Sequence, residues 1–263
     1  MKTIRDFAAA KVEHRKIVMV TTYDTWSARL LAAAPVDCLL VGDSAMMVMH
    51  GERDTLGATI EMMVMHTRAV VRGAPEKFIV TDMPFLAARK GRGHALDCAA
   101  QLLRAGAHAV KIEGIRGHAE IVSHLVESGI PVMGHLGLLP QSVHTVGGYT
   151  VQGREPAAAA GLREEAAMLE AAGAFAVVLE CIPHELARQV TAALKMPTIG
   201  IGAGAGCDGQ VLVLQDLLGL SPEFSPRFAR RFAEGAAVIR GGIEQYAAAV
   251  RSGEFPSAKE SYS

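Results

Sequence analysis

Charged and polar side chains stand at the ends of several short apolar runs, where their types and spacing could support chemistry. In chain order they are Asp43, Asp82, Lys111, Glu113, His135 and Glu180. A single acid in such a place is explained equally well as the cap of a following helix, and we expect Asp24 to be such a cap. For the whole set that explanation is weak, and a shared site for acid–base or metal chemistry is favoured.

Three of these residues offer the ligands of a magnesium site. Asp43, Asp82 and Glu113 supply hard oxygen donors, and the sequence has no HExxH motif or Cys/His set for zinc. Crowded carboxylates repel one another, which also favours a bound cation. A 2-oxo acid binds such an ion through its carboxylate and keto oxygens, and the ion stabilises the enolate that forms when a neighbouring C–H is lost. The acids therefore predict Mg²⁺-assisted enolisation of a small 2-oxo acid.

Three further residues have candidate roles in that reaction. Glu180 ends a different apolar run from the metal ligands, so it is free to act as the general base. Lys111 is expected to pair with the substrate carboxylate or the enolate oxygen, although it could instead only neutralise the acids. Ser44, next to Asp43, could donate a hydrogen bond to the substrate carboxylate or merely cap a turn.

Short apolar runs alternate with Ala-rich amphipathic stretches along the chain, as strands and helices do in α/β proteins. We expect strands at Ile17–Thr22, Cys38–Val41, Phe78–Thr81, Ala109–Ile112, Pro131–Met133, Ala176–Leu179, Thr198–Ile201 and Val211–Leu214. The clearest helical patterns cover Trp26–Ala34, His94–Ala105, His118–Ser128, Leu162–Ala172 and Glu185–Leu194. Strands that are apolar throughout are buried on both faces, which is typical of parallel sheets.

Eight strand–helix units predict a closed (β/α)₈ TIM barrel, with a doubly wound open sheet as the alternative. In both architectures the C-terminal ends of the parallel strands meet at one edge, so the polar residues at those ends would converge there. The chain has 263 residues, which suits one large domain, and we expect a single catalytic barrel over 1–263.

Two segments depart from the short connections of a compact barrel. Residues 136–160 are rich in glycine and are expected to form a long loop that closes over the site as a lid, or else a solvated insertion. Residues 226–263 are expected to form a closing helix, Arg227–Arg251, and a polar tail. Gly204–Gly209 matches G-x-G-x-x-G, but another strand-like run follows it, so no dinucleotide site is expected.

The composition narrows the class of protein further. Hydrophobic residues make up 50% of the chain, enough for a large core without disulfides, and the net charge is −1. No basic run is present, so we expect no nucleic-acid partner. No apolar stretch reaches membrane-spanning length, and the N-terminus lacks the apolar core of a signal peptide. With four scattered cysteines, expected to be free thiols, these features predict a cytoplasmic protein without membrane contact.

Several longer motifs resemble one enzyme family nearly end to end. They are TTYD at 21–24, LLVGDS at 39–44, HTRAVVRGAP at 66–75, TDMPF at 81–85, RAGAHAVKIEG at 104–114, GHLGLLPQS at 134–142, GGYTVQGR at 147–154, VLECIP at 178–183 and PTIGIGAGAGCDGQVLVLQDLLGL at 197–220. With these motifs the chain resembles the ketopantoate hydroxymethyltransferases. The resemblance implies a (β/α)₈ barrel that transfers the one-carbon unit of 5,10-methylenetetrahydrofolate to 3-methyl-2-oxobutanoate, giving 2-dehydropantoate in pantothenate biosynthesis.

The resemblance also implies roles at the matching positions. The metal ligands would be Asp43, Asp82 and Glu113, the last of them directly or through water. The residues in contact with the oxo acid would be Asp43, Ser44, Asp82, Lys111 and His135. The proton acceptor would be Glu180. The family further implies small-molecule substrates and a homo-oligomer, often a decamer.

The chain departs from the residues usual in the family at Gly57, Leu139 and Thr150. None of these is an acid, so the expected chemistry stands, whereas the folate side or the ordering of residues 136–160 could differ. Two other functions stay open at this point: a related oxo-acid barrel that cleaves a carbon–carbon bond, and a non-catalytic metal-binding scaffold. The first usually has a catalytic Cys in a Lys-Cys-Gly-His-like stretch, which this sequence lacks. The second leaves the lysine and the proposed base without roles.

Overall fold

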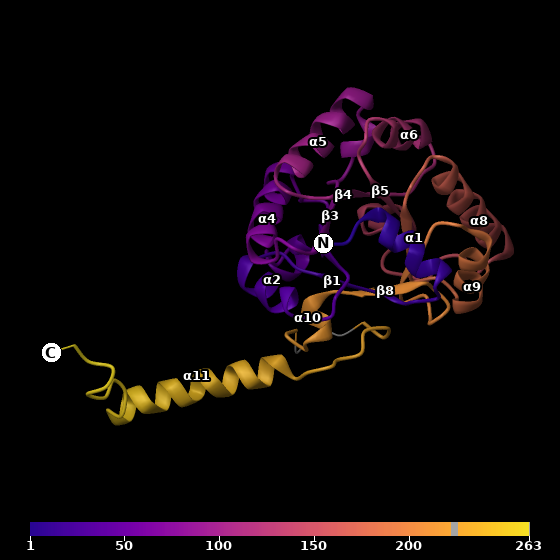
Figure 1. Cartoon of the computed structure of the whole chain (residues 1–263). Helices are drawn as coiled ribbons and strands as arrows, with labels where there is room; N and C mark the ends of the chain where they lie inside the picture. Colours follow the sequence, from indigo (N-terminus) through magenta and orange to yellow (C-terminus); the bar gives the residue numbers. More distant parts are fainter. Residues whose placement is uncertain (222–225, 263) are drawn as a thin grey trace. The chain divides into compact units, whose positions relative to one another are not determined.

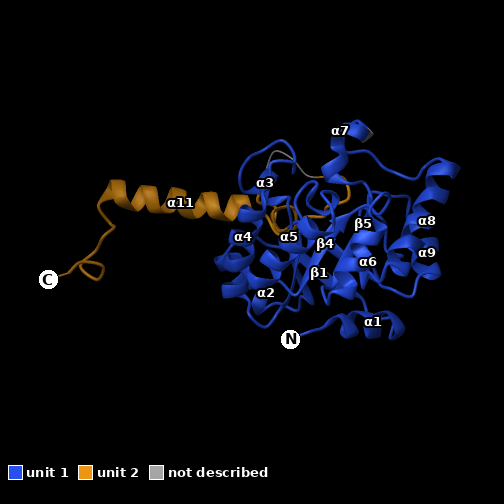
Figure 2. Ribbon diagram, turned by 90° about the horizontal axis from the view of Figure 1, so that it is seen from above, with its two compact units in different colours: residues 1–213 blue, residues 214–263 orange. Residues whose placement is uncertain are grey.

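The computed structural model describes residues 1–221 and 226–262 of the chain. Residue 263, the last of the expected polar tail, lies outside the described residues. The chain forms two compact units, Met1–Val213 and Leu214–Ser263, which Figure 2 shows in different colours. The expectation of one domain over 1–263 stays a prediction.

The first unit contains a closed barrel of eight parallel strands, in which β8 pairs with β1. The strands are β1 (Ile17–Thr21), β2 (Cys38–Val41), β3 (Phe78–Asp82), β4 (Ala109–Glu113), β5 (Val132–Gly137), β6 (Ala176–Glu180), β7 (Thr198–Ile201) and β8 (Gly209–Leu212). The predicted barrel is confirmed, and the doubly wound alternative is wrong because an open sheet has no pairing between its edge strands. Every predicted strand overlaps an observed one. The fifth ends later than predicted, since it stays paired with β6 as far as Gly137.

Helices surround the barrel, as the ring of ribbons in Figure 1 shows. The ring contains α2 (Thr25–Ala32), α4 (Ile60–Gly73), α5 (Arg92–Arg104), α6 (Ala119–Glu127), α8 (Pro156–Ala171) and α9 (His184–Ala193). The shorter elements of this unit are α1 (Ile4–Val12), α3 (Ala45–Val48), η1 (Ala87–Arg89), η2 (Pro140–Ser142) and α7 (Val143–Val146). Asp24 accepts a hydrogen bond from the backbone N–H of Ser27 and caps α2, as predicted.

An aromatic cluster closes the N-terminal end of the barrel. The rings of Phe7, Phe78 and Phe175 contact one another with centroids 5.3 to 5.9 Å apart. Phe7 belongs to α1, which Figure 2 places at the opposite end of the first unit from α7. The interior next to this cluster is packed with apolar side chains, as in other barrels of this kind. The open mouth is therefore the end at which the strands finish.

The segment 136–160 is less irregular than the sequence suggested. It begins inside β5, passes through η2 and α7, and ends inside α8, so only residues 138–139 and 147–155 lack helix or strand. The long-loop prediction is therefore wrong in extent. The reason is local: Pro156 occupies the first turn of α8, where its missing N–H costs nothing, and the alanines after it favour a helix.

The second unit contains α10 (Leu214–Leu217) and α11 (Gly235–Ser252). The predicted helix Arg227–Arg251 therefore begins too early. The backbone N–H groups of Phe232 and Gly235 donate to carbonyl oxygens at the end of α10. These hydrogen bonds hold the connecting stretch against α10 and delay the start of α11.

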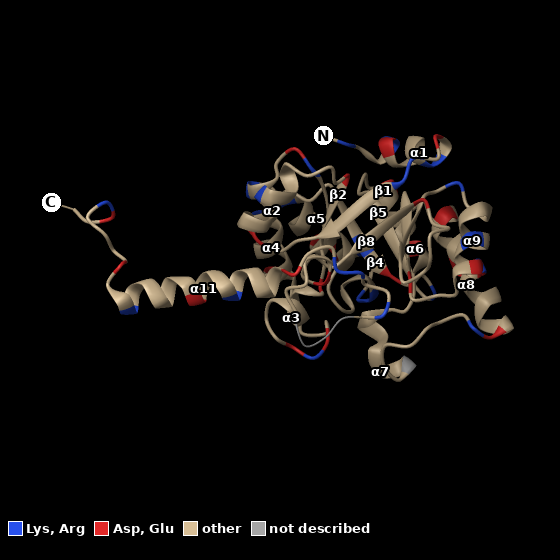
Figure 3. Ribbon diagram, turned by 90° about the horizontal axis from the view of Figure 1, so that it is seen from below, with Lys and Arg blue, Asp and Glu red and all other residues tan. Residues whose placement is uncertain are grey.

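The structure also shows where the charged residues lie, whether a helix could span a membrane, and the state of the cysteines. Lys and Arg occur on the same helices as Asp and Glu in Figure 3. Among the residues that the structure describes, no helix has both the length and the apolar character needed to cross a membrane. The cysteines Cys38, Cys98, Cys181 and Cys207 are free thiols.

Candidate active site

The polar residues predicted for one site lie together at the C-terminal mouth of the barrel. Asp82 is paired in register with Lys111 across β3 and β4, and Glu113 is paired with His135 across β4 and β5. The residues buried at the mouth, each at most 8% exposed, are Asp43, Asp82, Lys111, Glu113 and His135. Parallel pairing thus turns positions at successive strand ends into one cluster.

Asp43 and Asp82 lie on the same rim of the mouth. The backbone N–H of Asp43 donates to Oδ2 of Asp82 at 3.0 Å, while Lys111 Nζ lies 3.1 Å from Oδ1 of Asp82. The side chains of Lys111 and Asp82 are only 5% and 4% exposed, so water screens this ion pair little.

The charges of this cluster shift the pKa values of its members. Burial raises the pKa of Asp43 well above its ordinary value, and the charges of Asp82 and Glu113 add to the rise. Burial acts to lower the pKa of Lys111, but the charges of the three acids raise it above its ordinary value. Burial likewise acts to raise the pKa of Glu113, but its contacts with His135 and Lys111 bring it below its ordinary value. Lys111 therefore lies among three acids whose charges it compensates only in part.

His135 lies between the lysine and the candidate base. Its Nδ1 is 3.1 Å from Lys111 Nζ and 3.5 Å from Glu113 Oε1, and its Nε2 is 3.1 Å from Glu180 Oε2. Burial and the charge of Lys111 act to lower the pKa of His135, but its contacts with Glu113 and Glu180 raise it to about 9.

The protonation of the His135 ring decides what it can offer its neighbours. A protonated Nδ1 would face the Lys111 ammonium donor to donor, so the two positive charges would repel each other and no hydrogen bond would join them. When the ring is neutral and Lys111 donates to Nδ1, the ring hydrogen lies on Nε2. In both states Nε2 carries a hydrogen, and it lies at ion-pair distance from Glu180 without meeting the angles of a hydrogen bond.

Ser44 is positioned by a residue that the sequence analysis did not assign to the site. The phenol of Tyr23 is 1% exposed, donates to Thr21 Oγ1 at 2.8 Å and lies 2.8 Å from Ser44 Oγ. Burial raises the pKa of Tyr23, so the phenol stays protonated. Tyr23 stands in the TTYD motif, two residues after a strand that ends at the mouth, and this position was the available signal.

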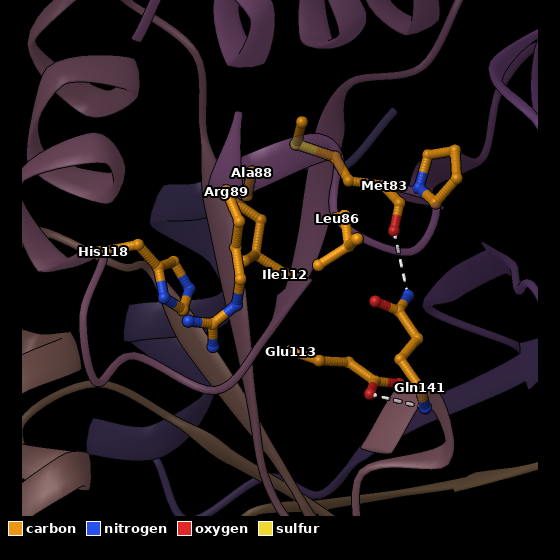
Figure 4. Close-up of a pocket in the computed structure, with 9 residues that line it drawn as sticks. Met83, Leu86, Ala88, Arg89, Ile112, Glu113, His118 and Gln141 are labelled. Atoms are coloured by element: carbon orange, nitrogen blue, oxygen red, sulfur yellow. Dashed lines mark hydrogen bonds between the residues drawn. The ribbon is translucent and has the colours of Figure 1, made fainter. Parts of the chain in front are cut away.

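A second unassigned residue, Gln141, contacts two of the acids. Its side-chain nitrogen donates to Asp43 Oδ2, and its backbone N–H donates to Glu113 Oε2. Figure 4 shows Gln141 between Glu113 and Met83, whose carbonyl oxygen also accepts from the side chain. Gln141 stands in the GHLGLLPQS motif, but an uncharged residue 98 positions from Asp43 carries no chemical signal of this contact.

Gly137 allows the chain to turn away from β5 next to the candidate base. Its φ is +94°, a conformation that side chains other than glycine rarely adopt. A Cβ atom at this position would collide with the carbonyl oxygen of Glu180. The turn leads directly into η2 and Gln141. The expected closure of residues 136–160 as a lid stays a prediction.

The residues at the mouth fit Mg²⁺, although not as a preformed cage. Within residues 1–221 and 226–262, no three His, Cys, Asp or Glu side chains already stand in a geometry that could hold a metal ion. Mg²⁺ commonly takes only one or two carboxylates and fills its remaining positions with water and substrate oxygens. Asp43 and Asp82 would supply such a pair, and the pKa of Asp43 is raised there by burial first and then by the charges of Asp82 and Glu113. A contact through water is then the role that suits Glu113.

The fold and the cluster together define a (β/α)₈-barrel enzyme with a buried acid–base site at the C-terminal mouth. The family model for ketopantoate hydroxymethyltransferase matches residues 1–258. The chain belongs to this family of hydroxymethyltransferases, so the predicted resemblance is confirmed. Family membership excludes the non-catalytic scaffold and decides against the carbon–carbon lyase that the sequence left open.

Curated relatives named 3-methyl-2-oxobutanoate hydroxymethyltransferase match along nearly their whole length. The protein of Bdellovibrio bacteriovorus is 52% identical over 263 residues, which cover 100% of both chains. The protein of Coxiella burnetii is 49% identical over 252 residues, or 95% of both chains. The protein of Legionella pneumophila is 48% identical over 260 residues, which cover 98% of this chain and 99% of the relative.

Solved structures of more distant enzymes share the fold. A 2,3-dimethylmalate lyase of the PEP mutase/isocitrate lyase superfamily matches with a TM-score of 0.60 and 18% identity, over 100% of this chain and 93% of that one. A phosphonopyruvate hydrolase in complex with oxalate and Mg²⁺ matches with a TM-score of 0.64 and 12% identity, over 99% and 93%. At these identities the likeness concerns the barrel fold alone.

Proposed function

We propose that this chain transfers a hydroxymethyl group from 5,10-methylenetetrahydrofolate to 3-methyl-2-oxobutanoate, giving 2-dehydropantoate in pantothenate biosynthesis. Family membership supports the reaction. The observation that carries the proposed site is the 3.1 Å contact between His135 Nε2 and Glu180 Oε2, next to the buried acids. In this contact the Glu180 carboxylate is available for proton transfer, and His135 is the neighbouring group that orients this carboxylate.

Glu180 is the proposed general base. Its side chain is 15% exposed, more than those of Asp82 and Glu113, so a small substrate can reach it. Glu180 takes the proton from C3 of the oxo acid, and the electron pair of the broken C–H bond spreads onto the keto oxygen as an enolate. Water adds to the one-carbon unit and both of its C–N bonds to the folate break, so that tetrahydrofolate leaves. C3 of the enolate forms the new carbon–carbon bond to this carbon, and the resulting alkoxide takes back the proton held by Glu180. His135 holds the Glu180 carboxylate through Nε2 and faces the developing alkoxide.

The other residues of the mouth bind and orient the oxo acid. Because the phenol hydrogen of Tyr23 goes to Thr21, the hydroxyl of Ser44 donates to Tyr23 in the free protein, and it turns to donate to the substrate carboxylate when the oxo acid binds. Lys111 stabilises the negative enolate oxygen, and it stays protonated because the surrounding carboxylates raise its pKa. Mg²⁺, which Asp43 and Asp82 would hold with Glu113 through water, would supply Lewis-acid stabilisation of the same oxygen.

We also propose that the protein is a homo-oligomer, of the decameric size that the family resemblance implies. Apolar side chains recur every three or four residues along α11, and each is at least 45% exposed: Ile239, Ile243, Tyr246 and Val250. Such a stripe on one helix face supports packing against another copy of the chain. Sedimentation that gives a monomeric mass would contradict this proposal. The four free thiols support a reducing, cytoplasmic location.

The proposed base is tested by exchange of the C3 proton of 3-methyl-2-oxobutanoate with deuterated water, followed by NMR with Mg²⁺ present. Glu180→Gln should slow the exchange at least about 100-fold, since general bases contribute about 10²- to 10⁴-fold. Glu185→Gln, the same change at an exposed residue of α9 paired with Arg188, is the matched control and should exchange as the wild type does. Wild-type exchange in Glu180→Gln with an intact fold would remove Glu180 as the base.

A further inference from the structure

The hydrogen bonds of Gln141 connect three strand ends of the mouth. Its side-chain nitrogen donates to Asp43 Oδ2 at 2.8 Å and to the carbonyl oxygen of Met83 at 3.0 Å. Its backbone N–H donates to Glu113 Oε2 at 3.0 Å, and Figure 4 draws the bonds to Met83 and Glu113 as dashed lines. One residue therefore bridges the ends of β2, β3 and β4.

The partners of the Gln141 side chain allow only one orientation of its amide group. Both partners of its side chain are acceptors, a carboxylate and a carbonyl, so the NH₂ end of the amide must face them. Each of the two amide hydrogens then has its own acceptor. Pro140, the residue before it in η2, has no N–H, and the N–H of Gln141 is given to Glu113. All the donors of Gln141 are thus directed at the acids and their surroundings.

We propose that Gln141 is a positioning residue that orients Asp43 and Glu113 for cation binding and couples the cation site to residues 136–160. The inference rests on the proposed function in one respect, that the cation is Mg²⁺ held by Asp43 and Asp82. Hydrogen bonds from outer residues fix the orientation of carboxylate ligands and tune their affinity. Because such coupling is reciprocal, an ion bound at Asp43 also stabilises the segment that carries Gln141.

A second glutamine in the same segment provides a matched comparison. The side-chain nitrogen of Gln152 donates to the carbonyl and hydroxyl oxygens of Thr150, so the hydrogen bonds of this side chain stay within its own segment, and only its backbone N–H, which substitution leaves in place, reaches Cys181. The same substitution at Gln141 and at Gln152 therefore separates an effect on the acids from a general effect on the segment. Methionine is the suitable replacement, since it keeps the length of glutamine without its donors.

The first test is calorimetric titration of the full chain with Mg²⁺ alone. Gln141→Met should weaken Mg²⁺ affinity by about 10- to 100-fold, the usual effect of losing a partner outside the metal ligands. Gln152→Met should bind as the wild type does, and Gln141→Ala should lose affinity like Gln141→Met and serves if methionine disturbs the fold. Equal affinity in all variants would overturn the inference alone. A wild type that binds no Mg²⁺ would refute the proposed metal site and this inference with it.

The second test reads the coupling to the segment without any catalytic measurement. Tyr149, 51% exposed between the two glutamines, is a natural site for chymotrypsin cleavage. Mg²⁺ should slow this cleavage in the wild type and in Gln152→Met but not in Gln141→Met. Equal protection in all three proteins would overturn the coupling. A Gln141→Met protein that loses thermal stability but keeps its Mg²⁺ affinity would reveal a merely structural role and would also overturn it.

Discussion

Replacing Lys111 with methionine tests the charge balance of the mouth. The substitution keeps most of the side-chain length and leaves Asp82 buried without its ion-pair partner. At 3.1 Å and an effective dielectric constant of about 20, the lost Coulomb interaction is about 5 kcal/mol. Breaking a buried pair by removing one partner costs about 3 to 5 kcal/mol. For a domain of this size that loss corresponds to a fall in Tm of about 6 to 20 °C.

The pH dependence of the loss follows from the directions of the pKa shifts. Because the pKa of Lys111 is raised in the folded state, the stability that this lysine contributes is fully present below about pH 10, the pKa of a lysine in the unfolded chain. A carboxyl whose pKa is raised in the folded state, as that of Asp43 is, costs stability as the pH rises above about 4 through the folded value. Without Lys111, whose charge acts to lower it, the pKa of Asp43 rises further. The variant should therefore lose more stability at pH 8 than at pH 5.

Denaturant unfolding followed by circular dichroism at pH 5 and pH 8 measures this difference. Lys195→Met, the same change at an exposed lysine before β7, should alter the unfolding free energy by less than about 1 kcal/mol at both values. Lys111→Met combined with Asp82→Asn should be more stable than Lys111→Met alone, because the unpaired charge is gone. A loss below about 1 kcal/mol at pH 8, or one equal at both pH values, would refute the reasoning.

Two further variants test the metal ligands and the position of Ser44. Asp43→Asn together with Asp82→Asn should abolish the heat of Mg²⁺ binding in calorimetry, and an unchanged affinity would overturn these two residues as ligands. Tyr23→Phe removes the phenol that holds Ser44, a loss of about 1 kcal/mol or about fivefold in KM for the oxo acid, with kcat nearly unchanged. A fall in kcat at constant KM would instead place Tyr23 in the chemical step.

The sequence by itself determined the architecture and which polar residues lie together at the mouth. Apolar runs alternating with amphipathic stretches predicted the barrel, and acids at the ends of those runs predicted one mouth. Both inferences succeed because neighbouring parallel strands run in the same direction, so residues at corresponding points of the two strands lie next to each other. Asp82 and Lys111, or Glu113 and His135, are brought together by strand order and register alone. The motifs between them also sufficed to predict the family.

Only the tertiary structure decided which of these residues contact one another. Lys111 pairs with Asp82, His135 spans Lys111 and Glu180, and Gln141 reaches Asp43 across 98 positions of sequence. The start of α11 likewise depended on hydrogen bonds to a distant helix end rather than on local helix preference. Such contacts arise when the barrel closes and the chain turns at Gly137. Secondary structure is read from the periodic pattern of apolar residues, and a single side-chain hydrogen bond produces no such pattern.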